Sequence, residues 1–145
     1  MHSSLVGTWK IISTEVRSED GQVSYPDGHD PKGYLIYGAD GYFSLAIMRS
    51  DRLKYASDDF RGGTTEEKAA AADSFVSYCG RYSFGEGTVT HHIEASLFPN
   101  WIDTEQHRFV EIKDEKLLLS TPPFFINGKN QKAYLIWERV GELCN

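Results

Sequence analysis

Two adjacent histidines, His91 and His92, are the residues of this chain best suited to proton transfer or metal binding, and Glu94 follows them. Imidazole titrates near neutral pH and is the commonest side-chain ligand of metals. Successive side chains of a strand point to opposite faces, so the two histidines cannot both line one site. The face that holds His91 is otherwise apolar, whereas the face of His92 is polar. We therefore expect His91 inside the protein and His92 with Glu94 in solvent.

No metal or cofactor site is predicted. The residues His92, Glu94 and His107 would share only a mixed, solvated face, and the sequence has neither a CxxC nor an HExxH pattern. It also lacks a Gly-rich phosphate loop, a dinucleotide fingerprint in strand-to-helix context and a GxSxG elbow. We therefore expect neither a metal nor an organic cofactor.

Arg108 is the second candidate for chemistry, because strand alternation places it on the same face as Val110 and Ile112. A buried guanidinium needs a carboxylate, carbonyl groups or an anionic ligand. Arg108 is thus either a structural plug paired with an acid such as Glu15, or an anchor for a carboxylate, carbonyl or enolate oxygen. His91 is likewise either a core histidine bonded to a tyrosine or a carbonyl, or a ligand contact and general acid–base.

The register between the two strands decides how these residues meet. If the segments form a hairpin that pairs Leu97 with Gln106, then Ala95 lies opposite Arg108. His91 and Arg108 are then four residues apart, roughly 13 Å at about 3.3 Å per residue. In that register they would hold opposite ends of one ligand.

Most of the chain has the pattern of short strands. Asp40-Gly41 and Asn127-Gly128 lie between apolar runs, as in tight hairpin turns. An antiparallel barrel removes exposed strand edges, and one of eight strands can hold a small ligand. We therefore predict an all-β, antiparallel barrel of eight, up to ten, strands in a single domain, 1–145. The expected strands are 8–16, 34–38, 41–48, 80–85, 88–97, 106–113, 116–121 and 131–140.

One segment favours a helix. Thr64 and Glu67 form a capping box and an alanine run follows. We predict a helix over about 65–79, ended by Gly80 and packed on the sheet through an apolar stripe. The stripe consists of Ala72, Phe75, Val76 and Cys79.

Net charge and the lack of long apolar stretches exclude some classes of function. The formal net charge of −6 is scattered, which argues against a nucleic-acid or anionic-membrane surface. No stretch has the length of a signal peptide or a membrane span, so we expect a cytoplasmic protein. In that compartment Cys79 and Cys144 would be free thiols.

The motifs LVGTWKIIS at the first strand and KAYLIWERV at the last resemble the ends of a lipocalin barrel. Between them, GYLIYGADGYFS, GRYSF, VTHHIEASLFPNW, QHRFVEI and KLLLSTPP follow in an order that resembles the small lipocalin-like domain family of bacteria and fungi. The resemblance covers about 5–140. It implies a calycin barrel with an internal cavity, closed at the bottom by Arg139 packed across Trp9. It implies no single function, since some relatives look like cofactor-free cyclases or isomerases.

The alternation of side chains along the strands and the family resemblance together define the expected wall of the cavity. Tyr82 and Phe84 share one face, and the family pattern selects Tyr37 on its strand. The orientation of the segment 41–48 stays open, because a bulge in the turn at 39–41 would reverse which of its faces points inward. His91 and Arg108 are also the catalytic candidates. The expected ligand-binding set is Tyr37, Tyr82, Phe84, His91, Ile93, Trp101, Arg108 and Val110.

Loops complete the expected site. The polar segment 49–64 is long enough to serve as a lid. The segment 121–130 and Trp101 would form an apolar rim at the mouth of the barrel.

Three functions are compatible with these features. The first is binding of a small, largely hydrophobic molecule with a polar oxygen, by a monomer or homodimer. The second is a cofactor-free isomerase, cyclase or dehydratase, with His91 as acid–base and Arg108 as oxyanion stabiliser. The third is an interaction domain with a filled barrel.

Overall fold

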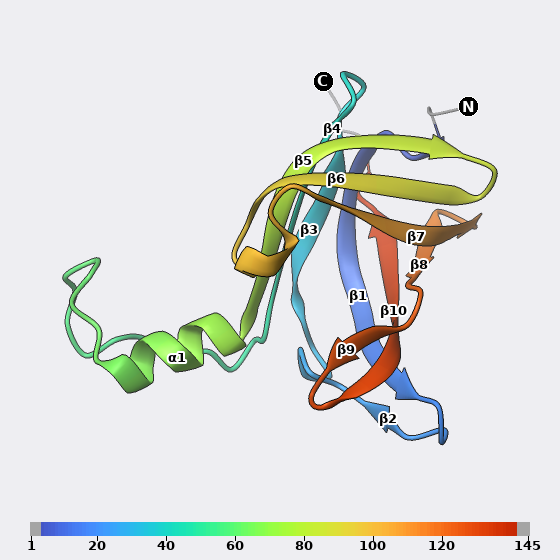
Figure 1. The fold of residues 1–145 in the computed structure, drawn as a ribbon. Coiled ribbons are helices and arrows are strands. Elements are labelled where there is room, and N and C mark those ends of the chain that lie inside the picture. Colours follow the sequence, from blue (N-terminus) through green and yellow to red (C-terminus); the bar gives the residue numbers. More distant parts are fainter. Residues whose placement is uncertain (1–3, 142–145) are drawn as a thin grey trace.

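The computed structural model describes residues 4–141 and shows a barrel with one projecting segment (Figure 1). Ten strands and one α-helix lie within these residues. Cys144 falls outside them. The strands are β1 (Gly7–Ser18), β2 (Val23–Ser24), β3 (Lys32–Tyr37), β4 (Tyr42–Met48), β5 (Phe75–Gly85), β6 (Thr88–Ser96), β7 (Thr104–Lys113), β8 (Lys116–Ser120), β9 (Phe124–Ile126) and β10 (Lys129–Arg139). The helix is α1 (Thr65–Asp73), and a 3-10 turn, η2 (Pro99–Trp101), joins β6 to β7.

Eight of the strands described between residues 4 and 141 close into an antiparallel barrel. Their order is β1-β3-β4-β5-β6-β7-β8-β10, and β10 pairs with β1 to complete the ring. The short strands β2 and β9 pair with β1 and β10 and lie at the same end of the barrel (Figure 1). The predicted eight-stranded, all-β barrel is confirmed.

The alternation of the strands fixes which side chains fill the interior. On β3, Leu35 and Tyr37 are buried, as expected. On β4, whose orientation the sequence left open, Phe43, Leu45 and Ile47 are buried. The strand begins directly after the Asp40-Gly41 turn, so Tyr42 points outward.

One end of the barrel is closed by the N-terminal tryptophan. The guanidinium carbon of Arg139 lies 4.2 Å from the ring centre of Trp9. Arg139 also donates to the carbonyl oxygens of Val6 at 2.9 Å and Ser4 at 2.6 Å. The arrangement implied by the family resemblance is therefore present.

The helix is shorter than predicted. The capping box forms, with Thr64 accepting from the amide of Glu67 and the Glu67 carboxylate accepting from the amide of Thr64. The helix then ends at Asp73, and the predicted continuation to residue 79 is wrong. Met48 of β4 pairs with Phe75, so strand hydrogen bonds replace helical ones from this residue onward.

Gly80 was expected to end the helix but lies inside β5. A Cβ atom at Gly80 would come within 2.0 Å of the carbonyl oxygen of His92 on β6. The glycine is therefore required by the close approach of two strands rather than by a helix terminus.

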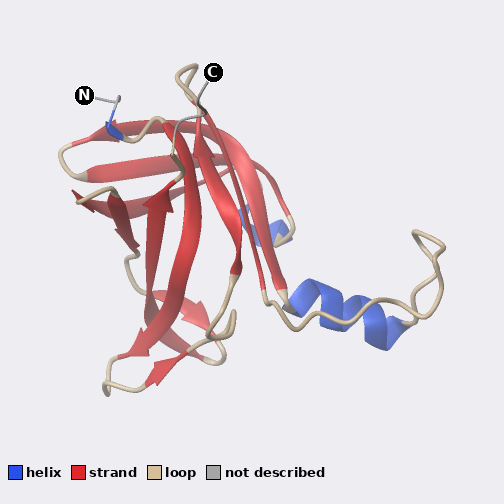
Figure 2. Ribbon diagram, turned by 180° about the vertical axis from the view of Figure 1, so that it is seen from behind, coloured by secondary structure: helices blue, strands red, loops and turns tan. Residues whose placement is uncertain are grey.

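Residues 49–74, which we call the arm, extend away from the barrel in both views (Figures 1 and 2). The helix α1 has no buried residue, so its predicted packing on the sheet is wrong. Leu53 and Phe60 on the arm are each 92% exposed. The segment 49–64 therefore does not cross the barrel end as the expected lid would. No helix in the described part of the chain is long and apolar enough to span a membrane.

Candidate functional site

The histidine pair divides as expected. His91 is 0% exposed, whereas His92 lies on the outer face, with Nδ1 3.1 Å from the carboxylate of Glu105. Glu94 is also outside and pairs with Arg81 at 3.1 Å. The side chains of His91 and His92 therefore belong to different environments, and only His91 is available to an interior site.

His91 is held by aromatic neighbours. The hydroxyl oxygen of Tyr37 lies 2.7 Å from Nε2 of His91, and the ring of Phe43 stacks on the imidazole at 4.2 Å and 15°. The other ring nitrogen, Nδ1, is buried and has no hydrogen-bond partner among residues 4–141. His91 is thus a core histidine bonded to a tyrosine, as one of the two interpretations expected, but with one nitrogen left unpaired.

Burial keeps this pair uncharged. It holds the pKa of His91 well below the ordinary value of 6.5, and electrostatic interaction with Arg108 and, less strongly, with His92 lowers it further. Burial also raises the pKa of Tyr37 well above the ordinary 10.0, an effect that Tyr78 increases and Arg108 opposes. Near neutral pH both side chains are therefore neutral.

Arg108 is buried, with 7% of its surface exposed. Its Nη1 donates to the carbonyl oxygen of its neighbour His107 at 2.9 Å, and its guanidinium carbon lies 5.6 Å from the ring centre of Trp101. The expected ion pair between Arg108 and Glu15 is wrong, because Glu15 pairs with Arg17 at 2.5 Å. Among residues 4–141, no carboxylate forms an ion pair with Arg108.

The predicted register between β6 and β7 is also wrong. Val89, not Ala95, lies opposite Arg108, and His91 lies opposite Gln106. His91 and Arg108 are therefore diagonal neighbours on the inner face, with Cα atoms about 7–8 Å apart for such a relationship. They converge on one region instead of holding opposite ends of a ligand.

A β-bulge and the 3-10 turn explain the error. The pairing of β5 with β6 skips one residue at Glu94, which reverses the facing of the residues that follow. Ala95 and Leu97, expected inside, are exposed, with Leu97 at 44%. The last pair of β6 and β7 is Ile93 with Thr104, so the connection that contains η2 spans residues 94–103 instead of the expected 98–105.

Aromatic rings continue the site on either side of His91. Tyr82 lies 4.7 Å from Tyr37 and donates to the carbonyl oxygen of Gly38 at 2.7 Å. Tyr78 lies 5.9 Å from His91 and 5.5 Å from Trp101, measured between ring centres. The rings therefore form one continuous aromatic wall, which ends at Trp101 on the β6–β7 connection.

The remaining expected wall residues lie in or against the core. Ile93 is fully buried, while Phe84 and Val110 are partly buried and pack against the core cluster. Ile112, expected on the inner face, is 37% exposed. The structure thus brings the expected set together, and their roles in ligand binding or catalysis stay predictions.

Three further residues of the site were missed. Tyr78 was assigned to the helix, although Val76, Tyr78 and Gly80 alternate as a strand would. Phe43 lay on the strand of undecided orientation. Trp137 was not considered, yet it is fully buried and its Nε1 has no hydrogen-bond partner; no sequence signal points to that unpaired group.

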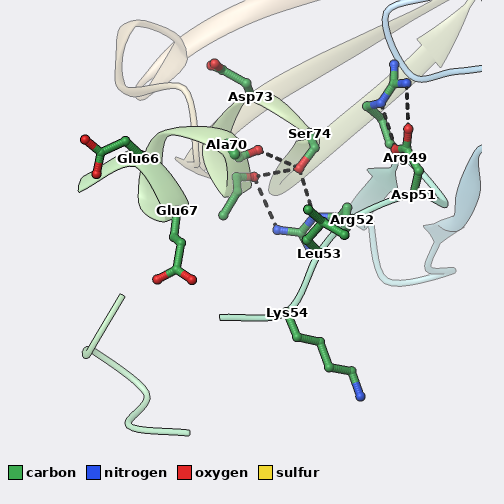
Figure 3. Close-up of a pocket in the computed structure, with 11 residues that line it drawn as sticks. Arg49, Asp51, Arg52, Leu53, Lys54, Glu66, Glu67, Ala70, Asp73 and Ser74 are labelled. Atoms are coloured by element: carbon green, nitrogen blue, oxygen red, sulfur yellow. Dashed lines mark hydrogen bonds and ion pairs between the residues drawn. The ribbon is translucent and has the colours of Figure 1, made fainter. Parts of the chain in front are cut away.

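The two grooves described here lie outside the aromatic cluster around His91. One, of about 580 Å³, lies within the arm between residues 49–54 and α1, where Arg52 donates to Ser74 and to the carbonyl oxygen of Ala71 (Figure 3). The other, of about 410 Å³, lies beside β2 and the β9–β10 turn. Neither contains the His91 cluster. Within residues 4–141 no group of three or more His, Cys, Asp or Glu side chains could hold a metal ion.

A closed antiparallel barrel with a polar pair set in an aromatic interior defines a lipocalin-type protein. The sequence model of the lipocalin-like domain family matches residues 6–140, and the chain belongs to that family. A curated relative, the 4'-hydroxy-3'-methoxypropiophenone carrier protein of Aspergillus oryzae, is 35% identical over 109 residues, which cover 69% of this chain and 98% of the relative.

Two solved structures are similar at lower identity. A lipocalin-like protein from Bacteroides uniformis is 14% identical with a TM-score of 0.49, and the match covers 94% of this chain and 98% of that one. An uncharacterized protein from Bacteroides eggerthii is 18% identical with a TM-score of 0.47, covering 92% and 98%.

Proposed function

We propose that this protein binds a small, largely apolar aromatic molecule with a polar oxygen inside its barrel. The observation that carries the proposal is the unpaired, fully buried Nδ1 of His91 next to the buried Arg108. A buried polar atom without a partner costs free energy, which a ligand oxygen would recover. The aromatic wall supplies faces on which a ligand ring can stack.

Membership of the lipocalin-like family and the named carrier function of the Aspergillus relative support small-molecule binding. The relative's name specifies an aryl ketone with a phenolic hydroxyl group. Such a molecule combines an aromatic ring with three oxygens, in a hydroxyl, a methoxy and a ketone group, which suits the mixture of rings and unpaired donors around His91.

A ligand would have to reach His91 past the aromatic rings around it. Trp101 is the wall residue most easily displaced, since it lies on the connection between β6 and β7 rather than on a strand. Connecting segments move more readily than the strands they join. We infer that the ligand enters by displacing the Trp101 ring from Tyr78 and Arg108.

Titration of the protein with 4'-hydroxy-3'-methoxypropiophenone, followed by isothermal calorimetry, tests the proposal. Wild type should bind with saturable heat, and His91→Phe should weaken the affinity by about threefold to tenfold, as expected for one lost hydrogen bond. His92→Phe, on the outer face of the same strand, is the matched control and should bind as wild type does. Absence of saturable binding by wild type would contradict the proposal for aryl ketones and favour a filled-barrel interaction domain.

A second candidate function is proton transfer by a cofactor-free isomerase, cyclase or dehydratase. The short contact between Tyr37 and neutral His91 favours it, since a neutral imidazole can accept a proton and Arg108 could stabilise an enolate oxygen. Exchange of the ketone's α-protons in D₂O, followed by NMR, measures this activity. An enzyme would accelerate exchange, and His91→Gln would keep binding but slow exchange by about 10²–10⁴. A carrier would leave the exchange rate at its uncatalysed value.

A further inference from the structure

Arg108 is the one charged side chain that is buried among residues 4–141. The other polar side chains that are buried in this range are Thr14, Ser18, His91, Thr121 and Gln131. Since His91 and Tyr37 are neutral, the interior around Arg108 has a net positive charge.

Within residues 4–141, no acid forms an ion pair that compensates this charge. The side chains of Glu105 and Glu111 on β7 are exposed and alternate with Arg108, so they lie on the outer face. The half-buried carboxylate of Asp27 accepts from Thr14 at 3.0 Å, and the positive charge that acts on it is Arg49, not Arg108. Burial of a cation without a counter-charge costs free energy. An anionic ligand that pairs with the cation would lower that cost.

We propose that the ligand binds as an anion, with its ionised oxygen paired to Arg108 and its aromatic ring beside Tyr78, in the place of the displaced Trp101 indole. This rests on the proposed function and adds the class of ligand. The class is aromatic oxygen acids, namely arenecarboxylates and phenols that a conjugated carbonyl group makes acidic. Their neutral ethers and esters are excluded from it.

The geometry supports this placement. Trp101 covers Arg108 with ring centre and guanidinium carbon 5.6 Å apart, and it also contacts Tyr78 at 5.5 Å. A ligand ring that takes the place of the indole would keep both contacts. Its oxygen would then lie at a guanidinium whose single protein hydrogen bond within residues 4–141 is to a backbone carbonyl. Arg is suited to such an oxygen because its planar fork donates two parallel hydrogen bonds to a carboxylate.

The test compares two probes that differ in one methyl group. 4'-Hydroxy-3'-methoxypropiophenone can ionise, whereas 3',4'-dimethoxypropiophenone cannot. A phenolate of this type absorbs at longer wavelength than the phenol, so absorption against pH reports the charge of the bound probe. We expect the bound phenol to ionise at least about one pH unit below the free phenol, because an adjacent positive charge favours the anion. We also expect it to bind at least about tenfold more tightly than the ether.

The variant Arg108→Gln should abolish the shift in the absorption midpoint and the preference over the ether, while the ether still binds. Arg108→Lys should restore part of the shift. Arg81→Gln, which removes an exposed arginine of β5, is the control and should change neither quantity. A third probe, 3,4-dimethoxybenzoate, is anionic at neutral pH and tests the carboxylate branch; its affinity should fall in Arg108→Gln.

The outcomes separate the two proposals. If wild type binds phenol and ether equally and the bound phenol ionises at the midpoint of the free one, this inference is wrong and the proposed function stands. If no probe binds, the proposed function fails for this class of molecule and the inference fails with it. Since ether binding by Arg108→Gln reports an intact barrel, loss of the shift in that variant cannot be ascribed to misfolding.

Discussion

The hydroxyl group of Tyr37 and Nε2 of His91 lie 2.7 Å apart in the interior of the barrel, although 54 positions separate the two residues in the sequence. Both side chains are sealed from solvent, at 1% and 0% exposed. Each side chain is therefore the hydrogen-bond partner of the other's buried polar atom. The contact links β3 to β6 across two intervening strands, β4 and β5.

Removal of the hydroxyl group in Tyr37→Phe should destabilise the protein. His91 would then have two unpaired ring nitrogens instead of one, which costs about 1–3 kcal/mol. Urea unfolding followed by tryptophan fluorescence measures the loss. Tyr34→Phe removes a hydroxyl group from the exposed face of the same strand and should cost less than about 0.5 kcal/mol. Equal effects of the two variants would show that the Tyr37 contact contributes nothing to stability.

Acidification should destabilise the protein through His91. Its pKa in the folded state lies well below the 6.5 of an unfolded chain, so the unfolded chain gains a proton that the folded protein does not. The stabilising contribution is thus full above pH 6.5 and is lost as the pH falls, by up to about 1.4 kcal/mol per pH unit. Burial raises the pKa of Asp27, which acts in the opposite sense, over the range from the ordinary pKa of a carboxyl group up to that raised value.

Urea unfolding at several values between about pH 5 and 6.5 isolates this effect. His91→Gln should flatten the dependence of the unfolding free energy on pH. His92→Gln, at the neighbouring outward position, should keep the slope of wild type. A slope that survives in His91→Gln would assign the pH dependence to other groups.

Gly80→Ala should be strongly destabilising. The added Cβ would lie 2.0 Å from the carbonyl oxygen of His92, so β5 and β6 would have to separate beside His91. Such overpacking costs about 1–3 kcal/mol or more. Gly85→Ala provides the comparison, since a Cβ at the end of the same strand meets nothing within 4 Å. Thermal unfolding of both variants measures the difference, and similar melting temperatures would contradict the strand approach described here.

Arg139→Lys should weaken the closed end of the barrel although it keeps the charge. A lysine cannot stack its head group on Trp9 and at the same time donate to the carbonyl groups of Val6 and Ser4. We expect a loss of about 1–2 kcal/mol in unfolding free energy. The matched change is Arg17→Lys, because Arg17 lies over Tyr134 at the same 4.2 Å but is exposed, and it should cost less than about 0.5 kcal/mol. The prediction fails if the two lysine variants are equally stable.

The barrel and its inner face were largely predictable because alternation and hairpin turns are local signals. His91 and Ile93 lie inside as their neighbours in sequence indicated, and Tyr37 lies inside as the family pattern implied. The end of the helix was not predictable in the same way. The segment from Phe75 to Cys79 fits a helical stripe and a strand equally well, and pairing with β4 decides between them.

The relation of His91 to Arg108 was beyond a local analysis for a different reason. It depends on where β6 stops pairing with β7. The last pair is Ile93 with Thr104, so residues 94–103 connect the paired strands, whereas the expected hairpin had residues 98–105 there. The inward facing of His91 and Arg108 was therefore predicted correctly, whereas the distance between them was not. The unpaired nitrogen of Trp137 depends on the packing of the entire interior, which no single segment specifies.

The arm leaves the sheet after Met48 and returns at Phe75, and these two residues are cross-strand partners. The amide of Arg49 donates to the carbonyl oxygen of Ser74 at 3.1 Å, which extends the same ladder by one step. To the barrel, all of residues 49–74 is therefore equivalent to a hairpin turn. Because loop-closure entropy rises only slowly with length, such a site tolerates insertion, shortening or replacement by a foreign peptide at little thermodynamic cost. The arm is therefore a replaceable segment, whose sequence can diversify while the strands and their register stay constant.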